Sequence, residues 1–420
     1  MNILIKNAQI LSPDSPYHNS NKDILIENGV ITKIGSRLKT EKGKTISSDN
    51  LHVSIGWMDI GALCGEPGYE HRETMETMSK TAAAGGYTAV APLPNTNPII
   101  DNKSSVQYIL NTTKDHIVDY YPIGAISKQC HGEEITEMID MHHCGAVAYS
   151  DGTQSVHSSG LMLRALQYAK GTDALIINTP NDPTLSNGNT VHEGEVSTSL
   201  GLKASPALSE LLTLERDLRL RDYADGRLLS HNISSADSVE KISEMKAKQH
   251  TTSVCYLNLC LTDEAVASFD VNVKVSPPLR SEDDRIALIR GINSGRIDII
   301  TSNHRPLEEE LKKKEFNYAE TGAIGLQTTF SGIITHAPKV TLNKIVMSLA
   351  VNTRKVLGLE MPQIDVDKVA NLTLFDPSAE WTLDEKTNQS LSKNSPFWNQ
   401  SLTGKVIGIV NGKQSYFNKY

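Results

Sequence analysis

Hydrophobic and polar positions alternate at both ends of the chain, with the period of two that is typical of β-strands. Residues 3–11 read ILIKNAQIL, and residues 23–35 read DILIENGVITKIG around an Asn28-Gly29 pair that predicts a hairpin turn. The C-terminal residues repeat the pattern around a second pair, Asn411-Gly412. We therefore expect a small β-sandwich domain built from both termini, residues 1–51 and 363–420.

The middle of the chain, residues 52–362, changes to short apolar segments that alternate with amphipathic helical segments. The expected strands are residues 87–93, 119–126, 145–150, 174–179, 226–233, 250–257 and 297–303. The expected helices are residues 73–86, 105–115, 158–171, 207–224 and 235–248. This order predicts an α/β fold, a (β/α)8 barrel of the TIM type, in which functional residues follow the C-terminal ends of the strands. A doubly wound open sheet is the alternative, but no G-x-G-x-x-G follows the first strand.

The composition of the chain argues against several classes of binding partner and against disulfide bonds. The 420 residues carry a net charge of −8 with both signs interspersed, which argues against nucleic acid. The five cysteines are odd in number and contain no C-x-x-C, so we expect no disulfide framework and a cytoplasmic location. No apolar run approaches the length of a membrane span, and we expect no membrane association.

Several motifs in a fixed order resemble those of the dihydroorotases, in the cyclic amidohydrolase branch of the amidohydrolase superfamily. That family begins its barrel with P-G-x-x-D-x-H-x-H-x-R-E-P-G, and residues 55–68 here read IGWMDIGALCGEPG. The other matching segments are residues 81–98, 274–285, 295–306, 322–330 and 392–406. The resemblance covers the chain from end to end and implies the barrel of that superfamily, although fold alone does not settle function.

The resemblance also implies which positions would hold zinc. Active relatives use two histidines of the first strand, an aspartate and two later histidines. Asp151 and His231 match two of these ligands. The remaining ligand positions carry residues that cannot bind a metal in the same way, namely Gly61, Leu63 and Thr179, and the upstream partner of His231 in the family's H-x-x-H-x-S motif is replaced by Leu228. We therefore expect no metal at this site.

The positions for proton transfer and substrate differ as well. The aspartate that serves as general base in the family corresponds to Asn303, and loss of a general base costs about 10²–10⁴ in rate. The substrate-binding arginine and asparagine of the family correspond to Gly65 and Ser276. Asn95, Arg280 and His304 remain as possible ligand-binding residues.

Other conspicuous residues have simpler interpretations. We expect His142-His143 at the surface, Cys64 as a buried thiol, and Asp59 as a structural, hydrogen-bonded carboxylate. His157 and His192 follow strands and could form a relocated metal site with His231 and Asp151, which stays open as an alternative.

The resulting hypothesis is a non-catalytic dihydroorotase homologue without a cofactor, which also forms homo-oligomers. Inactive members of the family serve as structural partners of aspartate carbamoyltransferase, so the resemblance implies that partner. One alternative is an active cyclic-amide hydrolase, dihydroorotase or hydantoinase-like, with a rebuilt site and zinc. Another is a module that binds a small anion at the barrel mouth through His231, Asn95 and Arg280.

Overall fold

The computed structural model describes residues 2–40, 43–245 and 250–419.

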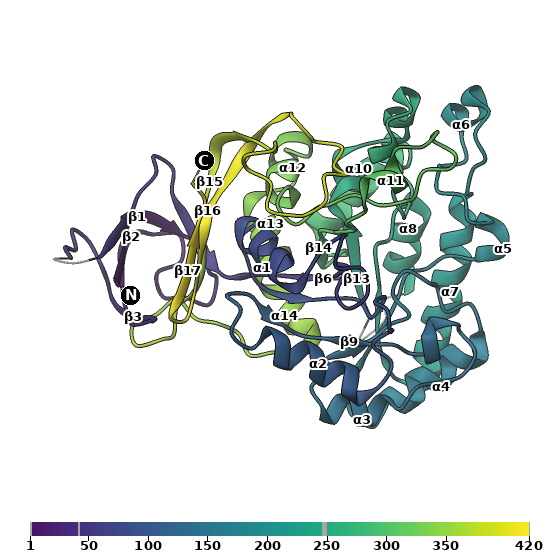
Figure 1. Cartoon of the computed structure of the whole chain (residues 1–420), viewed down its shortest axis with the longest axis horizontal. Coiled ribbons are helices and arrows are strands. Elements are labelled where there is room, and N and C mark those ends of the chain that lie inside the picture. Colours follow the sequence, from purple (N-terminus) through teal and green to yellow (C-terminus); the bar gives the residue numbers. More distant parts are fainter. Residues whose placement is uncertain (1, 41–42, 246–249, 420) are drawn as a thin grey trace.

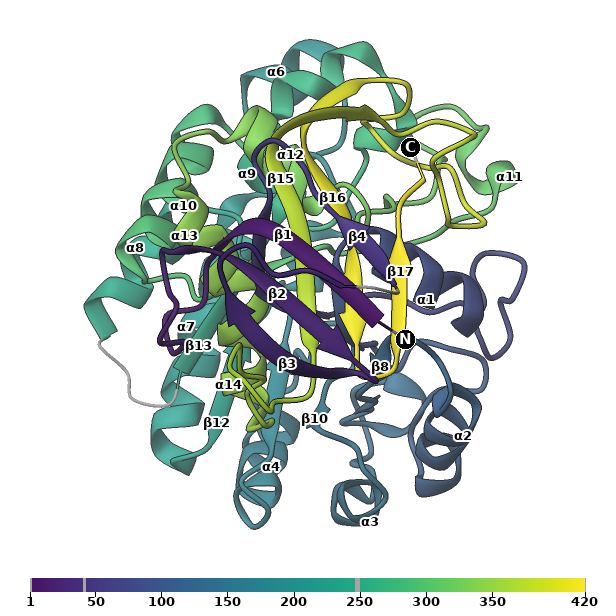
Figure 2. The ribbon, with the colours of Figure 1, turned by 90° about the vertical axis from the view of Figure 1, so that its left-hand side faces the viewer.

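Both chain termini contribute to one eight-stranded sheet. In this sheet the strands lie in the order β17-β16-β15-β5-β1-β2-β3, and β4 also pairs with β1. Figures 1 and 2 show the purple N-terminal strands beside the yellow C-terminal strands. The bounds are β1 (Asn2–Ile10), β2 (Asn21–Glu27), β3 (Val30–Gly35), β4 (Lys44–Ile46), β5 (His52–Ile55), β15 (Asn371–Thr382), β16 (Ser401–Asn411) and β17 (Gln414–Phe417).

The two predicted Asn-Gly turns are present, and they lie against each other. Asn28 and Gly29 both adopt positive φ, 52° and 85°, between the antiparallel strands β2 and β3. A Cβ on Gly29 would lie 2.7 Å from the backbone of Gly412. The residue type is therefore required both by the turn and by the close approach. β5 pairs with β1 and β15, which extends this sheet through Ile55.

The middle of the chain forms the parallel strands of the barrel. These strands are β6 (Trp57–Ile60), β7 (Tyr87–Ala91), β8 (Asp119–Tyr120), β9 (Ile123–Gly124), β10 (Ala148–Tyr149), β11 (Leu175–Asn178), β12 (Arg227–Ser230), β13 (His250–Cys255) and β14 (Ile299–Thr301). Neighbouring strands pair in parallel, in two sheets with the orders β6-β7-β8 and β9 to β14. Pro122 separates β8 from β9, because proline has no N–H to donate.

Helices surround these strands (Figure 1). They are α1 (Met75–Ala84), α2 (Lys103–Thr113), α3 (Met138–His143), α4 (Ser159–Lys170), α5 (Pro183–Ser186), α6 (Glu195–Leu200), α7 (Ala207–Ala224), α8 (Ala236–Met245), α9 (Tyr256–Cys260), α10 (Glu282–Ser294), α11 (Glu309–Lys312), α12 (Thr329–His336), α13 (Leu342–Val346) and α14 (Asn352–Leu357). The helix predicted at 235–248 is α8, and its residues 246–248 lie outside the described residues. No helix of the described ranges is long and apolar enough to cross a membrane.

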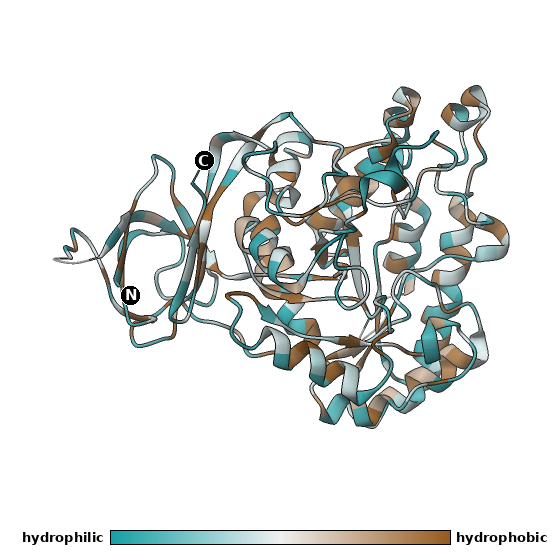
Figure 3. Cartoon of the chain, viewed as in Figure 1, coloured by the Kyte–Doolittle hydropathy of each residue, from teal (hydrophilic) through white to brown (hydrophobic). Residues whose placement is uncertain are grey.

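Apolar side chains from strands around the barrel pack into one buried cluster, and the colouring of Figure 3 shows hydrophobic residues along these strands. Because such strands can bring their side chains together only inside the barrel, this cluster fills the interior. Its members include Met58, Ile60, Ala89, Ala91, Ile123, Ala148, Leu175, Ile177, Leu229 and Ile299.

The gap between the first and last strands is bridged by Asp59, at the end of β6. Its Oδ1 accepts a hydrogen bond from the backbone N–H of Ser302 at 2.7 Å, and its Oδ2 accepts one from the Ser302 hydroxyl at 2.8 Å. In the loop after β6, the Leu63 N–H donates to the carbonyl of His304 at 2.8 Å. The structural role predicted for Asp59 is confirmed, and it holds the loops after β6 and β14 together.

Burial raises the pKa of Asp59 to about 7, against the hydrogen bonds from Ser302. Between pH about 4 and about 7 the folded state therefore holds a proton that the unfolded chain releases, so the free energy of unfolding falls as pH rises. The Asp59→Asn side chain cannot ionise, so the free energy of unfolding of this variant lacks this dependence on pH. We expect the stability of the wild type relative to Asp59→Asn to fall by up to about 4 kcal/mol between pH 4 and pH 8, measured by urea unfolding. Parallel pH curves for the two proteins would contradict this role.

Candidate functional site at the barrel mouth

The site lies in the loops that follow the C-terminal ends of β6, β12, β13 and β14. In a barrel of this type those loops surround a common mouth. Two contacts bring residues of these loops together. A Cβ built on Gly61 would overlap the His231 ring. Asn303 hydrogen-bonds the thiol of Cys255.

Both ring nitrogens of His231 are engaged in hydrogen bonds. Thr301 donates to Asn232 Oδ1 at 2.6 Å, which orients the Asn232 amide so that its Nδ2 donates to His231 Nε2 at 3.1 Å. His231 Nδ1 therefore carries the proton and faces the Ser253 hydroxyl at 3.0 Å. Burial, reinforced by the positive charge of Arg305, lowers the pKa of His231 to about 3, so the ring is neutral at physiological pH.

The His231 ring occupies the space beside Gly61 where a side chain would otherwise lie. Gly61 has φ of +96°, and a Cβ built on it would lie 2.4 Å from His231 Nε2. A side chain at position 61 and this position of the imidazole are therefore mutually exclusive. Sequence analysis predicted the loss of a ligand at Gly61 but not that the His231 ring lies in the space beside it.

Asp151 and Asn95 are held by hydrogen bonds between neighbouring loops. Both oxygens of Asp151 accept hydrogen bonds from Ser127, from its N–H at 2.8 Å and from its hydroxyl at 2.5 Å. Burial raises the pKa of Asp151. Asn95 Nδ2 donates to the Asp151 carbonyl at 3.2 Å, and its Oδ1 accepts from the Thr153 N–H at 3.0 Å. Each polar group of Asn95 thus supports the loop after β10.

The other positions at which the sequence predicts a lost functional residue have packing roles. Leu63 packs against the apolar cluster inside the barrel, and Leu228 is fully buried in the main core. A Cβ on Gly65 would lie 2.3 Å from the Tyr69 carbonyl, so the backbone leaves no room for a longer side chain. Thr179 is half-buried directly after β11.

Arg280 is bound by groups of the protein itself. Its Nε donates to the Ser234 hydroxyl at 2.7 Å, and its guanidinium forms a buried ion pair with Glu210 of α7 at 3.5 Å. Nη1 lies 3.3 Å from His192 Nδ1, and the pKa of His192 is lowered by burial and by this cation. The anion-binding role expected for Arg280 would compete with Glu210.

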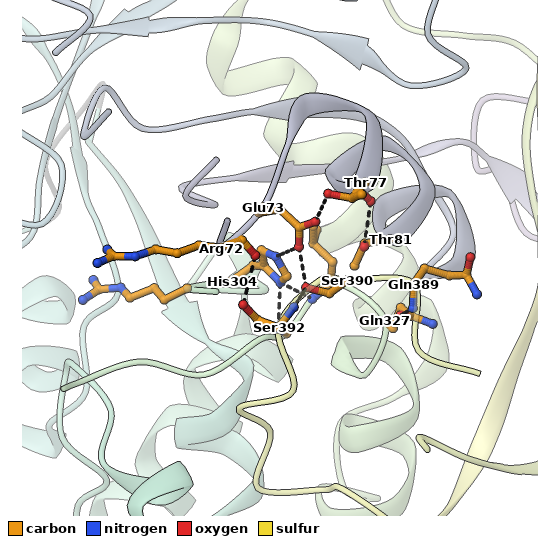
Figure 4. A network of polar contacts seen from close by, with 12 residues as sticks. Arg72, Glu73, Thr77, Thr81, His304, Gln327, Gln389, Ser390 and Ser392 are labelled. Atoms are coloured by element: carbon orange, nitrogen blue, oxygen red, sulfur yellow. Dashed lines mark hydrogen bonds and ion pairs between the residues drawn. The ribbon is translucent and has the colours of Figure 1, made fainter. Parts of the chain in front are cut away.

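His304 belongs to a buried network that reaches the C-terminal part of the chain (Figure 4). Its Nδ1 accepts from the Gly325 N–H at 3.1 Å, so Nε2 carries the proton and faces Glu73 Oε2 at 3.4 Å. Thr77 and Ser390 also donate to the Glu73 carboxylate. Sequence analysis missed Glu73 and Ser390, because they come from the loop after β6 and from the segment between β15 and β16.

Asn303 adopts a left-handed conformation with φ of 44°. Its Nδ2 donates to the Ser276 carbonyl at 2.9 Å, whereas its buried Oδ1 has no hydrogen-bond partner among the described residues. The amide is therefore tied to the loop that follows β13.

The remaining candidates are dispersed. Cys64 is buried as predicted, and burial raises the pKa of its thiol, which keeps it protonated. His143 and His157 are exposed and His142 is half-buried. Within residues 2–40, 43–245 and 250–419, no three histidine, cysteine, aspartate or glutamate side chains form a group that could hold a metal ion.

Known proteins resemble the chain over its whole length. A family model described as "Dihydro-orotase-like" matches residues 52–238. A dihydroorotase of Acetivibrio thermocellus is 38% identical over 417 residues, with 98% of each chain covered. A dihydroorotase of Geobacter sp. strain M21 is 36% identical over 423 residues, with 99% of each chain covered.

Solved structures share the fold. The L-hydantoinase (dihydropyrimidinase) of Arthrobacter aurescens has a TM-score of 0.85 at 22% identity, covering 99% of this chain and 96% of its own. The dihydropyrimidinase of Brevibacillus agri NCHU1002 has a TM-score of 0.81 at 21% identity, covering 100% and 95%. The predicted barrel with a sheet domain from both termini is confirmed.

The contact between Gly61 and His231 can be measured as a coupling energy. Gly61→Ala combines backbone strain with a clash against the ring, and we expect it to lower the free energy of unfolding by about 2–5 kcal/mol. Adding His231→Ala removes the clash but not the strain, so the pair should be coupled by about 1–3 kcal/mol. The control is Gly201→Ala, at φ of +65° with nothing within 4 Å, which should cost only about 1–2 kcal/mol. Additive losses at positions 61 and 231 would contradict the packing described.

Proposed function

The chain belongs to the dihydroorotase family, and from this premise we propose that it is a non-catalytic member that acts as a structural partner of aspartate carbamoyltransferase. The observation that carries the proposal is the position of His231, whose ring fills the space beside Gly61. In active relatives a zinc ion would lie among the ligand positions of this mouth, and zinc lowers the pKa of bound water to about 7.

The residues around His231 do not fit a zinc ion. A histidine ligand needs a free lone pair, but Nε2 of His231 accepts a hydrogen bond from Asn232, and Nδ1 carries a proton. Each oxygen of Asp151 already accepts a hydrogen bond from Ser127. Gly61 offers no ligand atom, so a stable site with three or more protein ligands lacks its donors.

Proton transfer and substrate binding are affected in the same way. Asn303 occupies the general-base position, and an amide cannot take up a proton as a carboxylate does. Gly65 has backbone atoms where an arginine side chain would begin. Arg280 is neutralised by Glu210, and Asn95 is held by the loop of Asp151. These arrangements favour a protein that acts through its surface.

Exposed leucines offer such a surface. Leu208 and Leu212 are 50% and 45% exposed, one helical turn apart on α7, and Leu185 of α5 is 38% exposed. The backbone of Asp182 hydrogen-bonds the Ser209 carbonyl at 3.0 Å, which places the start of α5 beside α7. Clustered apolar side chains at a surface are typical of interaction sites. We propose this face for the contact with aspartate carbamoyltransferase.

A second function, hydrolysis of a cyclic amide by a rebuilt site, is favoured by one observation. The full-length relatives at 36% and 38% identity carry the name dihydroorotase. Both functions fit the family, and they differ in whether the mouth performs chemistry.

Metal analysis of the purified chain, beside an assay of dihydroorotate hydrolysis, separates the two functions. We expect less than about 0.1 equivalent of zinc and no turnover above that of a sample without protein, because the ligands and the base are replaced. Expression with added zinc and assay with zinc present guard against metal loss. Close to one or two equivalents of zinc together with turnover would establish the hydrolase instead.

The partner is tested with aspartate carbamoyltransferase of the same organism. We expect co-elution in a fixed ratio on size-exclusion chromatography, and loss of co-elution with the double variant Leu208→Asp/Leu212→Asp, because buried charges would oppose an apolar contact. The matched control is Val369→Asp, at a 63% exposed residue beside the terminal sheet. The same columns report the proposed homo-oligomer. Separate elution of the two wild-type proteins would contradict the proposed partnership.

A further inference from the structure

A third Asn-Gly pair lies apart from the two that belong to the terminal sheet. It is Asn187-Gly188, directly after the short helix α5. In an Asn-Gly pair the backbone nitrogen of the glycine can attack the side-chain carbonyl carbon of the asparagine, because no Cβ on the glycine hinders the approach. All three pairs share this chemistry, so their surroundings in the folded protein decide which of them reacts.

The pair Asn411-Gly412 is held by hydrogen bonds on both of its reacting groups. Asn411 Nδ2 donates to the Ile117 carbonyl at 2.9 Å, and Asn411 Oδ1 accepts from Asn371 Nδ2 at 3.0 Å. The nucleophile is engaged as well, because the Gly412 N–H donates to the Ala370 carbonyl at 2.7 Å. The amide of Asn411 therefore cannot turn toward the glycine nitrogen without losing these bonds.

The pair Asn28-Gly29 is held by its hairpin. β2 and β3 pair directly on both sides of it. Gly29 is buried against the backbone of Gly412, and its carbonyl accepts from the Ala370 N–H at 2.8 Å. The attack requires the peptide unit between asparagine and glycine to rotate. Here that rotation pulls Gly29 away from both contacts, so the turn must open before it can react.

The pair Asn187-Gly188 has neither restraint. Both residues are exposed, and a Cβ on Gly188 would meet nothing within 4 Å. Among the described residues, none forms a hydrogen bond with the Asn187 side chain or with the Gly188 N–H. The Asn187 N–H donates to the Pro183 carbonyl at 3.0 Å, but α5 has only four residues, and so short a helix opens readily.

We propose that Asn187 is a site of spontaneous deamidation in the folded protein. The Gly188 nitrogen forms a bond to Cγ of Asn187 while the bond from Cγ to Nδ2 breaks, and the proton of the Gly188 N–H leaves with Nδ2 as ammonia. The product is a five-membered succinimide. One water molecule then opens this ring: cleavage of the new bond gives aspartate, and cleavage of the original peptide bond gives isoaspartate. Water is the only other reactant.

Isoaspartate at position 187 changes the end of α5. Its backbone continues through Cγ and is one carbon longer, and a carboxylate stands beside it. The Asn189 N–H now donates to the Ser186 carbonyl at 2.8 Å. A longer backbone between these two residues moves the donor away from its acceptor, so the loop after α5 loses this attachment. The reaction and its effect on the loop do not rest on the proposed function.

The test follows the folded full-length chain during incubation at mildly alkaline pH in water labelled with heavy oxygen. Peptide mapping by mass spectrometry then counts aspartate and isoaspartate at each Asn-Gly pair. We expect the products at Asn187 to form about tenfold faster or more than those at Asn28 and Asn411, which is roughly the effect of one or two hydrogen bonds on a rate. In urea the surroundings are lost, and the three pairs should react at similar rates.

Asn187→Gln is the matched variant, because the longer side chain disfavours the five-membered ring. It should form no product at position 187 and leave Asn28 and Asn411 unchanged. After ageing, hydrogen exchange in residues 183–190 should be faster in the wild type and unaltered in the variant. The proposal is overturned if Asn187 stays intact in the folded chain while it reacts in urea, or if Asn28 or Asn411 reacts as fast. The comparison of the three pairs within the wild type decides this even if the variant fails to fold.

Discussion

The carboxylate of Asp59 joins the two strands between which the barrel would otherwise be open. β6 and β14 belong to different sheets, and Ser302 meets Asp59 through its N–H and its hydroxyl. The loops that follow these two strands carry Gly61, Asn303 and Arg305. Their relative positions therefore depend on a hydrogen-bonded group that is deeply buried, and the geometry of the mouth follows from it.

Around this bridge, most polar side chains at positions that match functional residues of the family form hydrogen bonds or ion pairs within the protein. His231 is held by Asn232 and Ser253, Asp151 by Ser127, and Arg280 by Glu210. Such pairing offsets the desolvation cost that the buried groups would otherwise carry. It also leaves His231 without a free ring lone pair and Arg280 without an unpaired charge for a ligand. Arg305 is the contrast, because no carboxylate of the described residues forms an ion pair with its buried guanidinium.

The fold could be predicted because its signals are local. Alternating hydrophobic residues and the Asn-Gly pairs mark the terminal sheet, and α7 begins and ends at the residues expected, Ala207 and Ala224. The substitutions at Gly61 and Asn303 could be read from motif positions. The filling of the space at Gly61 by His231 could not, because it depends on packing across the barrel between distant residues. The same holds for the ion pair of Arg280 with Glu210.

The pairing of β5 with β15 has a consequence for synthesis on the ribosome. His52 lies opposite Phe375, so more than 300 residues must be added before the first of these strands meets its neighbour. At about 5–20 residues per second this takes roughly 15 to 60 seconds. Throughout that time the edge of β5 that later pairs with β15 is open, whereas β1 already has β2 and β4 beside it, and an open strand edge invites pairing with other chains. Protection of this one edge of β5 is therefore needed until β15 emerges.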